Sequence, residues 1–245
     1  MFRARAAIVL LATVSCGCAA LVTAHRDARE GNDYFPLHPG TLWVYEVRDS
    51  LGGVALERVL VRGLVHLGTQ DADGYVVEES GGLAGEFALD VEWHPVVYYR
   101  HDRFLYKFSG VDYVEGQLRE LRLGEGEEKV LPDDPAEHLE WHSDFDIFRP
   151  DPGSRYRATT TSTAIRVRQE LRVRAGTFAS CLGVESKSQL ESNEPHDRAR
   201  LLGFRYLDWY APGVGLVRSE VRSLEDGRLL TTLELVSFRD GRRRE

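Results

Sequence analysis

From residue 34 onward, apolar and polar side chains alternate over many short stretches, and this pattern predicts β-strands. In residues 87–93 every second side chain is apolar, and residues 165–173 repeat the pattern with charged side chains in between. A period of two with one polar face is typical of a half-buried antiparallel strand. Further strand candidates, rich in Val, Tyr, Leu and Thr, are 41–48, 56–66, 74–79, 95–100, 103–108, 155–163, 182–190, 202–210, 214–223 and 229–238.

Glycines next to acidic residues or to other glycines separate these stretches. They predict hairpin turns at Gly52-Gly53, Asp73-Gly74 and Glu225-Asp226-Gly227. About a dozen short strands at this spacing indicate an antiparallel sheet that curls around a core.

Helical signals are sparse. One short helix is expected over 135–142, because Asp134 can cap it, Pro135 suits its first turn and Glu137 completes a capping box. Residues 111–123 fit a helix or a strand equally well. The predicted fold is therefore all-β with minor α content: a curved antiparallel sheet, a half-barrel or open barrel of about 10–12 strands, with one short helix.

The first fifteen residues have the organisation of a secretory signal peptide. Arg3 and Arg5 form a positive start, residues 6–14 form an apolar run, and a small residue stands before each of Cys16 and Cys18. The apolar run is too short to cross a hydrocarbon core of roughly 30 Å as a helix, which needs about 20 residues. A cysteine directly after the cut resembles the lipobox of bacterial lipoproteins, where the thiol receives a diacylglycerol.

Two cysteines compete as the lipid acceptor. Cys16 is favoured because the apolar run stops there, and Cys18 is the alternative; neither has the leucine that usually stands three places upstream. An ordinary cleaved signal with incidental cysteines remains open as well. If Cys16 is acylated, Cys18 is free to pair with Cys181, whereas acylation of Cys18 leaves Cys181 alone. In either case the fold has to be held by its core and not by a disulfide framework.

The chain thus divides into a lipoprotein signal peptide (1–15), a lipidated N-terminus and tether (16–32), a single β-rich domain (33–239) and a basic tail (240–245). Removal of the signal leaves 29 basic against 39 acidic residues, a net charge of about −10. An acidic body argues against a nucleic-acid partner, because phosphate contacts need clustered Lys and Arg. The basic tail is interpreted as a solvated end.

Motifs of common catalytic centres are absent from the sequence or incomplete. No phosphate-binding loop and no Gly-x-Ser-x-Gly elbow occurs. His138 and His142 would share a helix face, but Glu140 is in the wrong position for a zinc protease and no third ligand follows. We therefore expect no catalytic residue, no metal and no cofactor, and we predict that the protein is not an enzyme.

Three further patterns are interpreted as structural. Asp71-Ala-Asp73-Gly74 is better explained as a hairpin turn than as the start of a calcium loop. The acidic stretch from Glu140 to Asp151 is interpreted as a solvated loop, and Cys181 as a small buried hydrophobe.

Three longer motifs resemble a broad set of uncharacterised bacterial secreted lipoproteins called TapB-like. They are Tyr34-Phe35-Pro36-Leu37-x-x-Gly40-x-x-Trp43-x-Tyr45, Val173-Arg174-Ala175-Gly176-Thr177-Phe178-x-x-Cys181 and Trp209-Tyr210-Ala211-Pro212-Gly213-Val214-Gly215-Leu216-Val217. The resemblance extends over most of residues 34–238, and the chain departs from it at Arg174, where the family more often has proline. It implies a half-barrel-like body, loosely similar to the lipoprotein carriers LolA and LolB, without established catalytic residues.

Physically these motifs indicate turns and large anchors. Pro39-Gly40 and Ala175-Gly176 are expected to launch strands, and Pro212-Gly213 with Gly215 is expected to shape a turn or bulge where backbone comes close. The candidate ligand-contacting or core aromatics are Trp43, Tyr45, Phe178, Trp209 and Tyr210.

The leading hypothesis is a non-enzymatic lipoprotein, exported and lipid-anchored in the bacterial envelope, at the outer membrane facing the periplasm. Its partners would be the membrane, through the lipid anchor, and an apolar small molecule or lipid on the curved sheet. The alternative is a structural lipoprotein that binds an envelope protein, of unspecified identity. An envelope hydrolase is the third hypothesis.

The lipid anchor can be tested directly. Mass spectrometry of the protein purified from the envelope should show a diacylglycerol on Cys16, because the apolar run ends there. Cys16→Ser should then abolish the modification, whereas Cys18→Ser should leave it in place. A mature chain with no acyl group on either cysteine would contradict the lipoprotein assignment.

Overall fold

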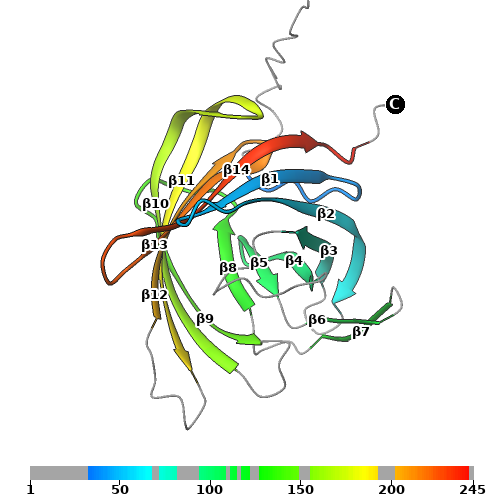
Figure 1. Ribbon diagram of the computed structural model, residues 1–245. Helices are drawn as coiled ribbons and strands as arrows, with labels where there is room; N and C mark the ends of the chain where they lie inside the picture. Colours follow the sequence, from blue (N-terminus) through cyan, green and yellow to red (C-terminus); the bar gives the residue numbers. More distant parts are fainter. Residues whose placement is uncertain are drawn as a thin grey trace, which may run out of the picture. The chain divides into compact units, whose positions relative to one another are not determined.

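The computed structural model describes residues 33–67, 72–81, 94–108, 111–114, 117–121, 127–148, 155–192 and 202–242. Within these residues every regular element is a β-strand, and none is a helix (Figure 1). The described part of the chain contains no helix that is long and apolar enough to span a bilayer. The predicted strand at 87–93 lies outside the described residues.

Twelve strands form one sheet in which all neighbours are antiparallel. Their order across the sheet is β8 (Glu127–Pro132), β5 (Phe104–Phe108), β4 (His94–His101), β3 (Ala72–Gly81), β2 (Val54–Leu67), β1 (Leu42–Asp49), β14 (Leu229–Arg239), β13 (Gly215–Ser223), β12 (Leu202–Ala211), β11 (Gly176–Ser192), β10 (Arg155–Val173) and β9 (Glu140–Phe148). A separate hairpin joins β6 (Val111–Val114) to β7 (Gln117–Leu121), so the ambiguous stretch 111–123 contains strands.

The sheet curls into a nearly closed barrel with one unsealed seam. Its edge strands, β8 and β9, follow each other in the chain and lie in contact, yet no backbone ladder joins them in the described residues. Side chains bridge the seam instead: the Lys129 N–H donates to Ser143 Oγ at 2.8 Å, and Trp141 Nε1 donates to the Lys129 carbonyl at 3.1 Å. The predicted open barrel of about 10–12 antiparallel strands is confirmed.

Two of the three predicted hairpin turns are confirmed. At the β1–β2 turn, Asp49 accepts the N–H of Gly53 at 2.7 Å and Gly52 has φ +89°. At the β13–β14 turn, Asp226 accepts the N–H of Arg228 at 3.0 Å and Gly227 has φ +71°. In both turns an acidic side chain binds the backbone and a glycine supplies the left-handed conformation.

The third predicted turn, Asp73-Gly74, is wrong, because both residues lie inside β3. A Cβ on Gly74 would lie 2.7 Å from Val97 Cγ1 and 3.2 Å from Leu67 Cδ1. The glycine is therefore needed for close packing against β4. The Asp-Gly pair at this position reflects packing and does not form a turn.

The predicted helix over 135–142 is also wrong. Residues 133–139 form bends and a turn, in which His138 has φ +66°, and β9 begins at Glu140. The His138 N–H donates to the Ala164 carbonyl at 2.7 Å, and the Ala164 N–H donates to the Leu139 carbonyl at 2.9 Å. Pairing with the long strand β10 thus outcompetes a short helix that only local capping would support.

The interpretation of residues 140–151 as a solvated loop is wrong for its first nine residues, which form β9. Glu140 and Asp144 are exposed there, whereas Trp141 and Ser143 are buried. The acidic residues mark the outer face of a strand, and the alternation with buried residues is the signal that identifies it.

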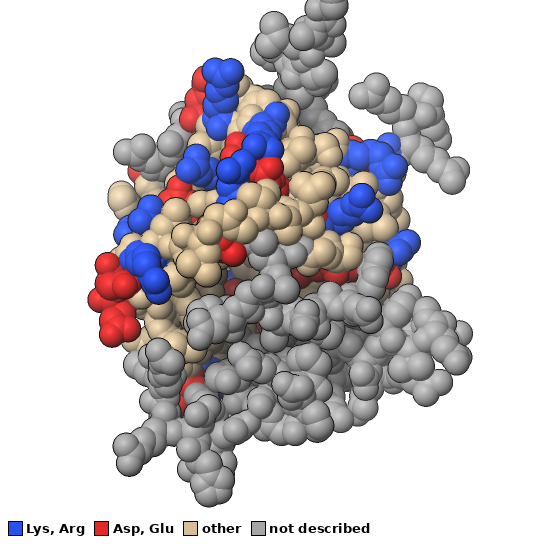
Figure 2. All heavy atoms as spheres, viewed as in Figure 1, with Lys and Arg blue, Asp and Glu red and all other residues tan. Residues whose placement is uncertain are grey.

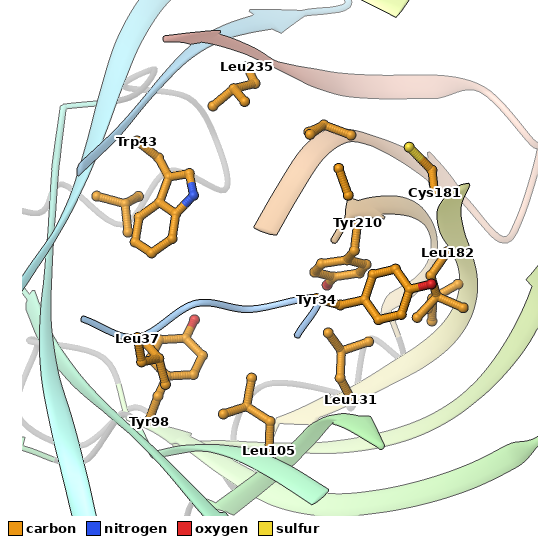
Figure 3. Packing of buried hydrophobic residues seen from close by; sticks show 14 of the residues in the cluster. Tyr34, Leu37, Trp43, Tyr98, Leu105, Leu131, Cys181, Leu182, Tyr210 and Leu235 are labelled. Atoms are coloured by element: carbon orange, nitrogen blue, oxygen red, sulfur yellow. The ribbon is translucent and has the colours of Figure 1, made fainter. Parts of the chain in front are cut away.

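The main hydrophobic core lies inside the barrel. Its buried members are Tyr34, Leu37, Trp43, Tyr45, Val59, Val61, Val77, Val96, Tyr98, Leu105, Leu131, Trp141, Ala164, Val173, Cys181, Leu182, Val184, Tyr210, Ala211, Val217 and Leu235. Tyr34 and Leu37 do not come from the sheet. They belong to residues 33–40, here called the N-terminal segment, which crosses the middle of the cluster in Figure 3. A smaller cluster on the other face of β2–β5 contains Leu67, Val76, Val97, Tyr99 and Phe108.

Two aromatic residues of β1 bind backbone carbonyls at the start of β13 and just before it. The Trp43 Nε1–H donates to the Val214 carbonyl, and the Tyr45 hydroxyl donates to the Leu216 carbonyl at 3.1 Å. Gly215 lies between the two acceptors with φ +103°, and a Cβ there would lie 3.0 Å from Trp43 Nε1. The close backbone approach predicted at Gly215 is confirmed.

Arg174 has a role that proline does not offer. It lies in the β10–β11 turn, and its N–H donates to Glu234 Oε1 of β14 at 2.9 Å. Its guanidinium pairs with Glu46 of β1, which also binds Arg48 at 2.6 Å. Arg174 thus ties the end of the β10–β11 hairpin to the first and last strands of the sheet in chain order.

Gly215→Ala should destabilise the protein more than Gly227→Ala. Both glycines have positive φ, but only Gly215 has an aromatic ring against the position of the new methyl group. We expect a loss of about 2–4 kcal/mol for Gly215→Ala and about 1 kcal/mol for Gly227→Ala in urea unfolding. Equal losses would show that Trp43 is not held against this backbone.

Candidate functional site in the barrel interior

The five candidate aromatics lie in or beside the core. Trp43, Tyr45 and Tyr210 are buried inside the barrel. Phe178 and Trp209 are half-buried and pack against the same cluster, and the Arg218 guanidinium lies 5.7 Å from the centroid of the Trp209 ring. Cys16 and Cys18, the candidate lipid acceptors, lie outside the described residues.

The histidine and aspartate motifs do not converge. His142 is exposed on β9, where its Nδ1 lies 3.0 Å from Thr161 Oγ1, and His138 lies in the preceding turn. Asp73 of β3 and His66 of the neighbouring strand β2 form an exposed pair, in which Asp73 Oδ1 lies 3.3 Å from His66 Nδ1. No cluster of His, Cys, Asp or Glu with the arrangement of a metal site occurs among the described residues.

Cys181 is a free, fully buried thiol inside the barrel. Burial raises its pKa to about 11, against which a backbone hydrogen bond from Leu171 acts in the opposite direction. The thiol donates to the Phe178 carbonyl at 3.5 Å. At neutral pH this cysteine is therefore protonated, which suits packing and not nucleophilic attack.

A group of ionisable residues that the sequence pattern did not predict faces the barrel interior. The group comprises Glu57, Glu79, Lys107, Glu128 and Asp208, here called the interior charge group. Residues directly opposite each other on antiparallel strands share a face of the sheet. Four of these residues are each paired with a member of the interior core, as follows: Glu57 with Tyr45, Glu79 with Val59, Lys107 with Tyr98 and Asp208 with Val184; Glu128 is paired with Lys107.

Lys107 lies at the centre of the interior charge group. Its Nζ lies 3.4 Å from Glu79 Oε1 and 5.9 Å from the centroid of the Tyr98 ring. Although both side chains face the inside of the barrel, Lys107 is 28% exposed and Glu79 is 31% exposed. Water therefore reaches this part of the interior, in contrast to the fully buried core next to it.

Burial shifts the titration of two carboxyl groups to near neutrality. The pKa of Glu57 rises to about 7 because of burial and then Glu79, while Lys107 acts in the opposite direction. The pKa of Asp208 also rises to about 7 because of burial, opposed by a hydrogen bond from Ser219. Both groups are protonated in a substantial fraction of molecules at neutral pH.

The charges approach each other across the barrel. Burial is the main cause that raises the pKa of Asp208 and of Tyr206 on β12, and Glu128 of β8 adds to it, although three strands and the seam separate β8 from β12. The carboxyl of Glu79 is the main cause that raises the pKa of Lys107. Strands β2, β3, β5, β8 and β12 thus present ionisable side chains to one shared space.

Strands β9–β11 add a wall of hydroxyl groups to this interior. Thr160 Oγ1 donates to Ser188 Oγ at 2.9 Å, and the hydroxyls of Ser162 and Ser186 lie 2.8 Å apart. These side chains are polar without charge, and they satisfy one another in pairs. The arrangement offers hydrogen-bond donors and acceptors next to an apolar core, which is suited to recognition of a molecule with both a polar and an apolar part.

The outer face of the barrel has a different charge arrangement. On the face in Figure 2, basic and acidic side chains lie among one another over the described surface. Cross-strand ion pairs occur there, such as Arg205 with Glu185 at 3.1 Å and Arg62 with Glu78. The interior charge group, by contrast, has four carboxyl groups and one ammonium group.

Comparison with known proteins identifies the fold. No family model matches the chain, and no curated protein matches it. The crystal structure of a lipoprotein candidate from Parabacteroides distasonis ATCC 8503 is similar, with a TM-score of 0.54 and 17% identity over 84% of this chain and 98% of that chain. A candidate exported protein with a YmcC-like fold from Bacteroides fragilis NCTC 9343 has a TM-score of 0.47 and 14% identity over the same shares. The resemblance to TapB-like proteins and to LolA and LolB stays a prediction.

Asp208→Asn should weaken the pH dependence of stability. A carboxyl whose pKa is raised in the folded state stabilises the fold below its unfolded pKa, and this contribution is lost as the pH rises through the folded pKa of about 7. Between pH 4 and 7.5 the free energy of unfolding of the wild type should fall by about 1–2 kcal/mol more than that of the variant. This is less than the full pKa shift corresponds to, because water reaches the site and weakens the effect.

Asp226→Asn is the matched control for this experiment. The Arg228 N–H lowers the pKa of Asp226, so its contribution is present above pH 4 and lost as the pH falls. The two variants should therefore change the pH profile in opposite directions, as measured by urea unfolding across the pH range. Parallel profiles for wild type and Asp208→Asn would contradict a raised pKa at this site.

Proposed function

We propose that the protein is a non-enzymatic envelope lipoprotein that binds an amphiphilic ligand inside its barrel. The signal-like start and the cysteine at position 16, with Cys18 as the alternative, would place it on a membrane through two acyl chains. The similarity of fold to a lipoprotein candidate supports this assignment. We place the protein at the outer membrane facing the periplasm.

The observation that carries the ligand part is the interior charge group. Ionisable side chains seldom face a protein interior unless they are paired or have a function. Here Lys107 and Glu79 face inward, keep water contact and adjoin a wall of apolar and aromatic side chains. Ligand sites usually combine a concave apolar surface with a few polar groups in this way.

The balance of charge favours a particular class of polar head. Carboxyl groups outnumber the single lysine, so an anionic head would be repelled, whereas an amine or a set of hydroxyls would find acceptors. The hydroxyl wall of β9–β11 offers further partners for a head of this kind. The apolar part of the ligand would extend along the core aromatics such as Trp43 and Tyr98.

Three probes with the same twelve-carbon chain test this proposal: dodecylamine, dodecyl maltoside and dodecanoate, each below its micelle concentration. We expect the full-length chain with Cys16→Ser and Cys18→Ser to bind the amine and the maltoside more tightly than dodecanoate, as measured by tryptophan fluorescence and calorimetry. Absence of binding for all three probes, or a preference for dodecanoate, would contradict the proposal.

Glu79→Gln should reverse part of this preference. Loss of the carboxylate leaves Lys107 with a weaker partner, so the affinity for dodecylamine should fall about tenfold and that for dodecanoate should rise. Glu78→Gln is the matched control, because the adjacent residue faces outward and pairs with Arg62. It should leave the affinities for all three probes unchanged.

A further inference from the structure

We infer that the N-terminal segment, residues 33–40, is a displaceable occupant of the ligand site, and that the apolar chain of the ligand takes its place. The inference rests on the proposed function, because it concerns the same interior. It adds that the free protein holds its own pseudo-ligand and that ligand binding is coupled to release of the N-terminal segment. This coupling is what distinguishes the segment from an ordinary part of the core.

The segment occupies the wall that an apolar chain would contact. Tyr34 and Leu37 are 4% and 5% exposed and belong to the interior cluster. The ring of Phe35 lies 4.9 Å from that of Tyr98 and 5.7 Å from that of Trp43. In Figure 3 Tyr34 lies on the side of Tyr210, and Leu37 lies on the side of Tyr98.

Tyr98 connects the segment to the interior charge group. Phe35 packs against its ring, and the Lys107 ammonium lies 5.9 Å from the centre of the same ring. A ligand whose head binds at Lys107 would therefore direct its apolar chain towards the space that Phe35 and Leu37 occupy. The polar and apolar parts of the proposed site are continuous at this one residue.

The segment can leave without breaking the sheet. It belongs to no strand, since β1 begins at Leu42. At its start, the Asp33 carbonyl accepts the Gly213 N–H at 2.7 Å, and Arg100 donates to Asp33 Oδ1 at 2.9 Å. At its end, the Gly40 N–H donates to the Val61 carbonyl at 2.8 Å. Elements with few ladder hydrogen bonds are the ones that open first in folded proteins.

Exchange is favoured over simple withdrawal. Withdrawal alone would expose three large apolar side chains, so the free protein keeps the segment inside. A ligand chain that covers the same wall would remove most of this penalty. Because Gly40 stays bound to the sheet, release would add the seven residues 33–39 to the tether and lengthen its reach by roughly 25 Å.

Thiol accessibility provides the direct test. In the full-length chain with Cys16→Ser, Cys18→Ser and Cys181→Ala, the added substitution Leu37→Cys reports on the segment, and Leu235→Cys reports on the sheet. We expect saturating dodecylamine or dodecyl maltoside to raise the rate of reaction of Cys at position 37 with a water-soluble thiol reagent at least tenfold. The thiol at position 235, which is fully buried in β14, should stay protected.

Affinity provides a second, independent readout. Asp33→Asn removes an exposed carboxylate that binds Arg100, so it loosens the segment without altering the core. Because apparent affinity scales with the fraction of molecules in which the site is open, this variant should bind the probes about threefold more tightly. Leu37→Ala should increase the affinity further, provided that circular dichroism shows an intact fold.

The two proposals can fail separately. If the probes bind while the thiol at position 37 stays protected and Asp33→Asn leaves the affinity unchanged, the segment is a permanent part of the core, and only this inference is overturned. If no probe binds to the wild type, to Asp33→Asn or to Leu37→Ala, both the inference and the proposed ligand binding are overturned.

Discussion

Between β8 and β9, where the described residues form no backbone ladder, the barrel closes through side chains. The edge strands β8 and β9 meet at a seam that is bridged by Trp141 and Ser143, each bonded to the backbone of Lys129. The rings of Phe104 and Trp141 also lie 6.3 Å apart across this seam. An open sheet edge is exposed to other strands unless it is covered, so the interior core has to hold the two edges together. The inward-facing side chains of the sheet itself contribute to that closure.

This constraint explains why the interior has two different parts. Tightly packed aromatic and aliphatic side chains supply the burial that closes the sheet around the N-terminal segment. The neighbouring part contains Lys107, Glu79 and the hydroxyl pairs of β10 and β11, where water contact keeps ionised groups tolerable. A barrel filled throughout with apolar side chains would close more firmly, so the interior charge group comes at a cost to stability. That cost is a physical argument for the ligand role proposed above.

Alternation along the chain predicted most of the sheet because one face of each strand is buried and the other is solvated. Turn chemistry was equally informative at Gly52 and Gly227, where an acidic side chain and a glycine act together. It misled at Gly74, since a glycine required for packing against Val97 has the same local sequence as a turn. The helix expected over 135–142 does not form because residues 138–148 pair with β10. That partner strand is distant in the sequence, so a local pattern does not reveal it.

The interior charge group was accessible to sequence analysis in principle. Lys107 lies two positions from Leu105, so alternation places both on one face of β5. What the sequence does not contain is the register that brings Glu79, Glu128 and Asp208 to the same space from three other strands. Strand order around the barrel is a property of the whole chain, and it decides which charges meet.

The three motifs that carry the family resemblance meet around the N-terminal segment. Tyr34 of the first motif donates to the carbonyl of Ser180 in the second at 3.3 Å. Gly213 of the third motif donates to the Asp33 carbonyl, and Val214 accepts the indole N–H of Trp43. Residues that are distant in the chain therefore converge where the segment enters the barrel. These motifs therefore hold the N-terminal segment as well as the sheet.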